Sequence, residues 1–146
     1  MGAGLAKEFS RRYRGLEQSY RRHCEGYHQY NREWPVGQLY VFQSVQTTPV
    51  LIVCFPTKDD WRLGSKLEYL ARGFDNLADC IAEYKIQSIA FPILGCGLGG
   101  LLEEDVLPYM ESRLEKLAIP IEIWQPVEKP ASALRWKNER GAPMHR

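Results

Sequence analysis

The sequence lacks most of the features that announce a metal centre, a disulfide framework or a nucleic-acid-binding surface. Its four cysteines, Cys24, Cys54, Cys80 and Cys96, form no C-x-x-C pair, and the three histidines add no metal-ligand spacing to them. We therefore expect reduced, mostly packed thiols and no metal site. The net charge is only +1, so the overall charge gives no sign of a nucleic-acid partner.

Two further absences concern location. No run approaches the roughly 18 apolar residues that a membrane span needs. No secretory signal is visible either. We therefore expect a cytoplasmic protein that has no membrane partner. The 146 residues suit a single domain, and a chain of this length buries enough surface to fold without a metal or a disulfide.

What the sequence does contain is an alternation of helical and extended patterns. The apolar periodicity of helices appears in residues 5–24, 65–85 and 101–117. Gly15 is expected to break or kink the first of these stretches. Ser65 and Glu68 are spaced as a capping box that would begin the second. The arginines of the first stretch predict either a solvated helix surface or a patch that faces phosphate.

Short runs rich in β-branched and aromatic residues predict strands. These runs are residues 38–43, 50–55, 88–94 and 119–124. Strands that alternate with helices are typical of the α/β class, with a mainly parallel sheet and helices on its faces. Ligands of such folds bind at the carboxyl ends of the strands. Because loops 56–62 and 94–100 each follow a strand directly, we expect both to open on the same edge of the sheet.

The loop Gly95-Cys-Gly-Leu-Gly-Gly100 is the strongest chemical signal. Its glycines let backbone N–H groups converge on an anion, and the helix that follows directs its positive end to the same place. Phosphate is the natural ligand, and Gly2 and Gly4 suggest a second phosphate contact. The loop also matches the G-x-G-x-x-G fingerprint, in which Glu122 would hold a ribose hydroxyl. An NAD-binding Rossmann-type oxidoreductase is therefore an alternative.

Three motifs resemble the macrodomains of the DarG branch, which remove ADP-ribose from DNA bases. They are MGAGLAKEF at 1–9, FPTKDDWR at 55–62 followed by SKLE at 65–68, and ILGCGLGGL at 93–101. The resemblance covers residues 1–125 and implies a three-layer α/β/α fold. The first two strands of that fold, with the asparagine that ends the second, have no counterpart here. We therefore expect an N-terminally shortened macrodomain or an upstream start, followed by a basic, loosely ordered tail at 126–146.

The resemblance also implies roles for particular residues. Lys58 is implied as the catalytic residue near the anomeric carbon, where it would stabilise a departing base or attack the opened sugar through its amine. Trp61 is a candidate for stacking on a base. Asp59 and Asp60 replace basic residues of the family and would lower affinity for a DNA backbone. The residues implied to bind ADP-ribose are Gly2, Ala3, Gly4, Leu5, Thr57, Leu94, Gly95, Cys96, Gly97, Leu98, Gly99 and Gly100.

The implied function is an ADP-ribose-binding macrodomain that hydrolyses ADP-ribosyl linkages on DNA, with ADP-ribose as ligand or product and no cofactor. ADP-ribosylated DNA and a cognate ADP-ribosyltransferase toxin are its implied partners. The main alternative is a module that binds ADP-ribose or a related nucleotide without cleaving it. A domain without a ligand, which interacts through its basic tail, is a further alternative.

Overall fold

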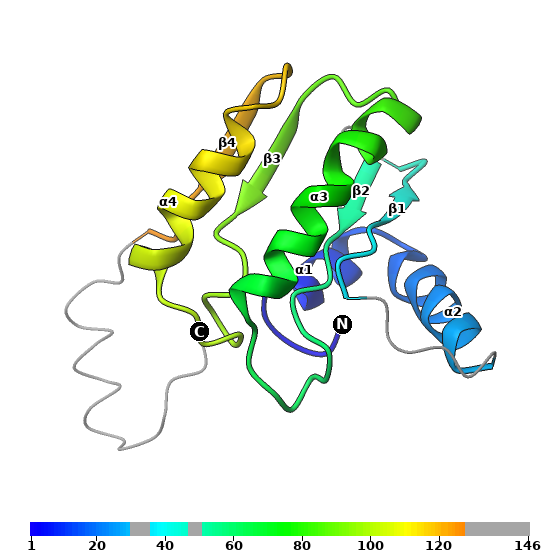
Figure 1. Cartoon of the computed structure of the whole chain (residues 1–146). Coiled ribbons are helices and arrows are strands. Elements are labelled where there is room, and N and C mark those ends of the chain that lie inside the picture. Colours follow the sequence, from blue (N-terminus) through cyan, green and yellow to red (C-terminus); the bar gives the residue numbers. More distant parts are fainter. Residues whose placement is uncertain (30–35, 47–50, 128–146) are drawn as a thin grey trace.

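The computed structural model describes residues 1–29, 36–46 and 51–127 (Figure 1). The tail predicted at 126–146 lies almost entirely outside these ranges. Within them, helices and short strands follow one another in the order α1, α2, β1, β2, α3, β3, α4, β4. This order confirms the α/β class. No helix in the described part of the chain is both long enough and apolar enough to cross a membrane.

The amino-terminal stretch forms two helices, α1 (Gly4–Arg12) and α2 (Leu16–Gln29). Gly15 separates them with a φ of +86°, a left-handed conformation that glycine adopts without steric cost. The predicted break is therefore confirmed. Arg11 and Arg21 each pair with a glutamate of their own helix on an exposed surface, which is the arrangement of a solvated helix face.

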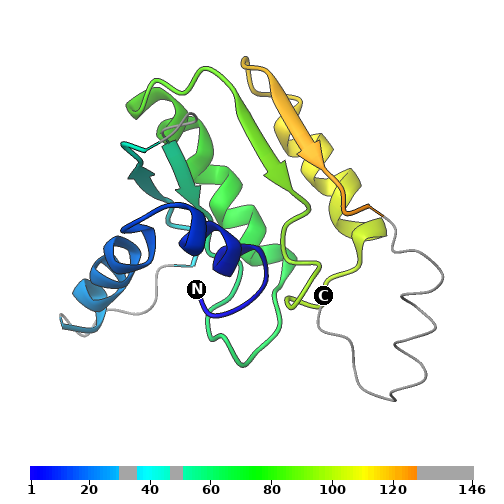
Figure 2. The same ribbon diagram turned by 180° about the vertical axis from the view of Figure 1, so that it is seen from behind.

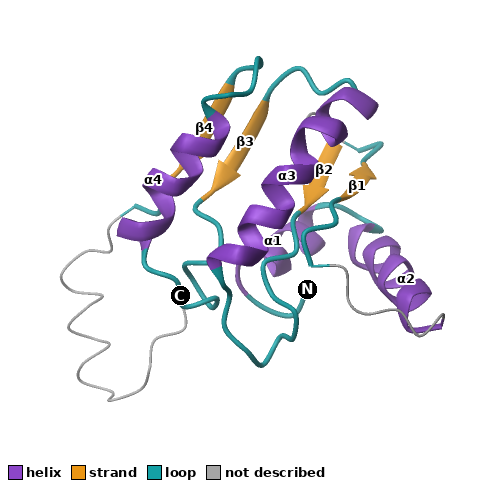
Figure 3. Ribbon diagram, in the orientation of Figure 1, coloured by secondary structure: helices purple, strands orange, loops and turns teal. Residues whose placement is uncertain are grey.

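The strands form two separate two-stranded sheets (Figure 3). β1 (Tyr40–Gln43) pairs antiparallel with β2 (Leu51–Cys54), and β3 (Ile89–Pro92) pairs parallel with β4 (Ile121–Trp124). β2 and β3 lie next to each other in both views of the molecule but are not hydrogen-bonded (Figures 1 and 2). Among the described strands, only the second pair has the parallel arrangement that the sequence predicted for most of the sheet.

Helices cover both faces of these strands. α3 (Leu67–Glu83) and α4 (Glu103–Leu114) lie in front of them in Figure 1, and α1 lies behind, as the reverse view in Figure 2 shows. Helix, strand and helix layers therefore follow one another, as the resemblance implied. α3 starts two residues later than predicted, with Lys66 as its N-cap and no side-chain hydrogen bond at the cap. The predicted capping box of Ser65 and Glu68 is wrong.

Two apolar cores hold the layers together. The carboxy-terminal core combines one face of α3 with β3 and α4, and its buried residues are Leu70, Phe74, Leu77, Phe91, Ile93, Leu94, Val106, Met110 and Leu114. The amino-terminal core is smaller, and its buried residues are Tyr13, Leu16 and Ile52. The spacing of four and three residues along α3 produces its buried face, as the sequence predicted.

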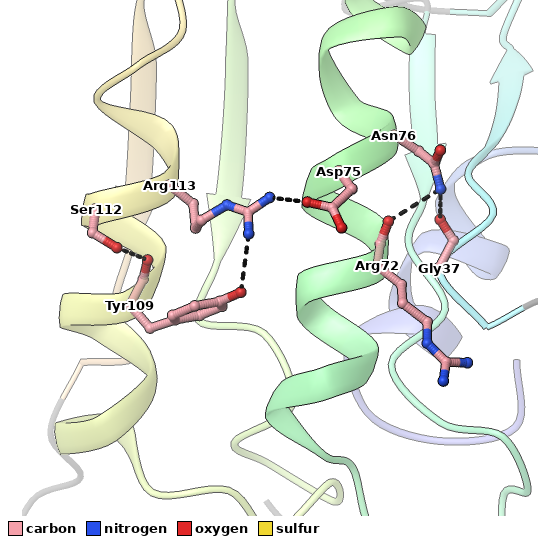
Figure 4. Close-up of polar contacts among 7 residues, drawn as sticks. All are labelled: Gly37, Arg72, Asp75, Asn76, Tyr109, Ser112 and Arg113. Atoms are coloured by element: carbon pink, nitrogen blue, oxygen red, sulfur yellow. Dashed lines mark hydrogen bonds and ion pairs between the residues drawn. The ribbon is translucent and has the colours of Figure 1, made fainter.

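Polar contacts fix α3 between its neighbours (Figure 4). Arg113 of α4 forms an ion pair with Asp75 of α3 and also donates to the Tyr109 hydroxyl. On the other side of α3, the Asn76 amide donates to the carbonyl oxygen of Gly37, at 2.9 Å, just before β1. α3 is therefore bonded on one side to α4 and on the other to the segment that leads into β1.

Candidate active site

Three segments of the chain meet at the carboxyl edge of the strands. They are the start of α1, the loop after β2 and the glycine loop after β3. The Lys58 ammonium donates to the carbonyl oxygen of Leu98 at 2.9 Å. The Leu98 side chain lies 3.8 Å from the position that a β-carbon on Gly4 would take. The expectation that the loops after both strands open on the same edge is therefore confirmed, and the first glycine segment joins them there.

The glycine loop is closed on itself by backbone hydrogen bonds. The Leu101 N–H donates to the Gly95 carbonyl oxygen at 3.0 Å, and the Ser65 N–H donates to the Gly99 carbonyl oxygen at 2.8 Å. A β-carbon on Gly99 would lie 2.2 Å from the Gly95 oxygen, which no side chain tolerates. A β-carbon on Gly97, by contrast, would meet no heavy atom within 4 Å. The tight turn therefore depends on glycine at position 99 and not at position 97.

The two helix ends near this edge differ in charge. α4 begins with Glu103, Glu104 and Asp105, whose carboxylates compensate the positive end of the helix dipole and would repel a phosphate. α1 carries no acidic residue in its first turn, and its N-cap Ala3 makes no side-chain hydrogen bond. The helix end best suited to an anion is therefore that of α1 and not, as the sequence predicted, that of α4.

Lys58 lies at the wall of a pocket of about 370 Å³. Its ammonium is held between two carbonyl oxygens, that of Leu98 and, at 3.5 Å, that of Trp61. The Trp61 side chain is 83% exposed beside the same pocket, so one aromatic surface is free to take a planar group. The full set of lining residues is Tyr20, Pro56, Thr57, Lys58, Asp59 and Trp61.

The acidic pair after Lys58 is partly neutralised within its own loop. Asp60 accepts hydrogen bonds from the Arg62 side chain and backbone, and the shortest ion-pair distance is 2.6 Å. These hydrogen bonds lower the pKa of the Asp60 carboxyl to about 2. Asp60 is therefore a partner of Arg62 at neutral pH and not a proton donor.

Two residues of this edge were missed from the sequence. Tyr20 of α2 lines the pocket, and burial raises the pKa of its phenol. A single aromatic residue on a helix is typical of the core, so no sequence pattern could have distinguished Tyr20 from a core residue. Ser65 lies under the glycine loop, with 8% of its surface exposed, where the sequence placed a helix cap.

The other predicted site residues are distributed unevenly. Gly2, Ala3 and Leu5 are exposed at the start of α1. Leu94 packs into the carboxy-terminal core, so only its backbone is available to a ligand. The Cys96 thiol donates to the Leu94 carbonyl oxygen at 3.5 Å, and burial raises its pKa. In the parts of the chain that the structure describes, no three side chains of histidine, cysteine, aspartate or glutamate lie close enough together to hold a metal ion.

The dinucleotide-fold alternative finds no support at its acidic position. Glu122 lies inside β4, with isoleucines on either side of it, and accepts a hydrogen bond from the Trp124 indole at 2.9 Å. It is therefore not placed at the end of the strand that follows the glycine loop. The structure joins none of the four cysteines in a disulfide.

Comparison with known proteins gives consistent matches. The Macro domain family model matches residues 1–110. A DNA ADP-ribosyl glycohydrolase of Thermus aquaticus is 34% identical over 132 residues, which are 89% of this chain and 35% of the relative. The chain therefore spans about a third of the length of that curated relative.

Solved structures lead to the same group of proteins. The macrodomain of Mycobacterium tuberculosis DarG superposes with a TM-score of 0.75 at 36% identity, covering 88% of this chain and 82% of the other. Thermosipho africanus DarTG in complex with ADP-ribose superposes with a TM-score of 0.68 at 28% identity, covering 90% of this chain and 36% of the other.

Proposed function

The chain belongs to the macrodomain family, in the branch of the DarG macrodomains, and we propose that it binds ADP-ribose where its three loops meet and hydrolyses ADP-ribosyl linkages on DNA. The observation that carries this proposal is the contact of Lys58 with the Leu98 carbonyl oxygen, at 2.9 Å. That contact joins a cation to the glycine loop, whose glycines would let backbone N–H groups turn toward a diphosphate.

The binding half of the proposal rests on backbone groups. Loop 95–100 wraps the diphosphate and the ribose distal to adenine. The N–H groups of the first turn of α1, whose N-cap Ala3 makes no side-chain hydrogen bond, approach the same ligand from the other side. The Leu98 side chain lies against Gly4, so the two segments are near enough for one diphosphate to contact both. A relative solved in complex with ADP-ribose supports the choice of ligand.

The catalytic half rests on Lys58. Hydrolysis breaks the bond between the anomeric carbon of the distal ribose and the base, water supplies a hydroxyl to that carbon, and the base leaves with a proton. In this scheme the Lys58 ammonium stabilises the charge that develops on the departing base. Trp61 stacks on the base itself, a contact worth about 1–3 kcal/mol in single-strand recognition.

The proposed reaction also indicates the partner, the substrate and the location of the protein. A hydrolase for ADP-ribosylated DNA needs a transferase that installs the modification, so we propose a cognate ADP-ribosyltransferase toxin as its partner. ADP-ribosylated DNA is the substrate, free ADP-ribose is the product, and no cofactor takes part. The cytoplasm, where the DNA of a bacterium lies, is the proposed location.

Calorimetric titration of the purified chain with ADP-ribose, alongside NAD and AMP, tests the binding half. We expect ADP-ribose to bind more tightly than either control. The catalytic half is then tested by release of ADP-ribose from a modified oligonucleotide, followed by chromatography. Selective binding without release would leave a binding module in place of an enzyme. A folded chain that binds none of the three ligands would overturn the whole proposal.

A further inference from the structure

One polar group under the glycine loop has no part in the scheme above, and that is the hydroxyl of Ser65. The residue is only 8% exposed. Its Oγ is a buried side-chain atom without a hydrogen-bond partner among the described residues. The helix cap that the sequence predicted does not use it, because α3 begins two residues later with Lys66 as its N-cap.

The hydroxyl is directed into the loop. The Ser65 N–H donates to the Gly99 carbonyl oxygen at 2.8 Å, which ties this residue to the loop through its backbone. Its Oγ lies 2.3 Å from the position that a β-carbon on Gly99 would take, and the Gly95 carbonyl oxygen lies 2.2 Å from the same position. The hydroxyl and the Gly95 oxygen therefore converge beside the Gly99 α-carbon without being bonded.

The Gly95 carbonyl is a suitable acceptor for this hydroxyl. It already accepts from the Leu101 N–H at 3.0 Å, and a carbonyl oxygen has a second lone pair. Buried hydroxyls are almost always hydrogen-bonded in folded proteins, so an unpaired one next to a free acceptor calls for an explanation. A small rotation of the loop would bring the two atoms into bonding distance.

We propose that Ser65 is a positioning residue of the diphosphate loop, whose hydroxyl bonds the Gly95 carbonyl oxygen only when a diphosphate ligand occupies loop 95–100. The inference rests on the proposed function, because hydrogen bonds from the loop N–H groups to the bound diphosphate are what favours the rotation of the loop. The hydrogen bond then forms in the bound state alone, so its whole contribution goes into ligand affinity and none into the stability of the free protein.

A pair of serine variants tests the proposal. Ser44 is also buried, at 3% exposed, but its Oγ already accepts from the Gln46 N–H at 3.2 Å. Ser65→Ala is expected to leave the melting temperature of the free protein unchanged or higher, and to weaken ADP-ribose binding about tenfold. Ser44→Ala is expected to lower the melting temperature and to leave ADP-ribose affinity unchanged. Calorimetry and thermal melting with and without ADP-ribose measure both quantities.

The outcomes separate the two levels of the argument. If wild type binds ADP-ribose and Ser65→Ala binds it equally well, the inference is wrong while the proposed function stands. A drop in the melting temperature of free Ser65→Ala, as large as that of Ser44→Ala, would also overturn it, because the hydroxyl would then be bonded without ligand. If the folded wild-type protein does not bind ADP-ribose, the proposed function fails and takes this inference with it.

Discussion

The amino-terminal and carboxy-terminal cores differ in how much apolar side chain they bury. Among the described residues, nine buried side chains form the carboxy-terminal core, and three form the amino-terminal one. α1 contains no fully buried residue, although it carries the first glycine segment of the site. The two-stranded sheet of β1 and β2 adds little, because an isolated pair of strands is marginally stable.

This difference divides the candidate site. The glycine loop 95–100 belongs to the well-packed half. The start of α1 and the part of the pocket wall formed by Tyr20 belong to the poorly packed half. Regions with few buried contacts open more often than the rest of a protein. We therefore expect the diphosphate loop to move only by the small rotation that pairs Ser65 with Gly95, and α1 to make the larger adjustment to the ligand.

Truncation of one leucine in each core is the most forceful way to test the comparison. Leu70 and Leu16 are both almost completely buried. Leu70→Ala is expected to cost about 3–5 kcal/mol of unfolding free energy, because its dense surroundings cannot collapse around the cavity. Leu16→Ala is expected to cost about 2 kcal/mol, since its smaller cluster can close. Urea unfolding measures both, and equal losses would contradict the distinction between the cores.

Lys58→Ala removes the hydrogen bond to the Leu98 carbonyl oxygen that joins the two halves. If Lys58 acts on the departing base, kcat falls about a hundredfold while the Kd for ADP-ribose changes less than about threefold. Lys66→Ala is a matched control, because Lys66 lies in the same connection and faces the Tyr69 ring. Single-turnover release of ADP-ribose and calorimetry separate the two effects. A large loss of affinity with unchanged turnover would make Lys58 a binding residue only.

The rigidity of the glycine loop can be probed with two alanine substitutions. Gly99→Ala places a methyl group against the Gly95 carbonyl oxygen, and overpacking of this kind costs about 1–3 kcal/mol. We expect ADP-ribose affinity to fall about tenfold or more. Gly97→Ala meets no neighbour and is expected to leave the melting temperature of the free protein unchanged, whereas Gly99→Ala lowers it. Thermal melting of both variants without ligand decides the point, and equal losses would contradict the dependence of the turn on Gly99.

The smallest expected effect is a loss of stability at alkaline pH that is concentrated in the amino-terminal half. Burial raises the pKa of the Cys54 thiol to about 12, and it also raises those of Cys24 and Tyr20. The folded state keeps protons that the unfolded chain releases above about pH 9, so stability falls as the pH rises through the window from about 9 to 12.

Urea unfolding of the wild type and of Cys54→Ala between pH 7 and 10.5 measures this loss. The variant removes the largest of these thiol shifts, so its stability should depend less steeply on pH. Hydrogen exchange should show the extra opening in β1 and β2. A parallel decline of both proteins would assign the effect to other groups.

Much of the local structure was readable from the sequence, because it depends on neighbouring residues. Gly15 marks the boundary of α1 and α2, and the four- and three-residue spacing of α3 gives its buried face. The convergence of the two loops after β2 and β3 followed from strand order alone. The catalytic role of Lys58 stays a prediction, because nothing in the structure shows a reacting sugar.

What the sequence could not supply depends on contacts between distant segments. Ser65 has the spacing of a helix cap, but its N–H is bound to Gly99, thirty-four positions away, and the helix begins two residues later. The acidic first turn of α4 was visible, yet its effect on a phosphate depends on where the loop before it points. Tyr20 entered the site only because α2 packs beside the loop after β2.

The hydrogen bond from Lys58 to Leu98 joins the less densely packed half of the molecule to the well-packed half, and we expect the two halves to open to different extents. A complete site therefore exists only in the fraction of molecules in which both parts are folded at the same moment, and the apparent dissociation constant is the intrinsic one divided by that fraction. ADP-ribose that contacts both halves would stabilise the state in which both are folded. Bound ADP-ribose would therefore raise the cooperativity of unfolding most in variants whose amino-terminal half is least stable.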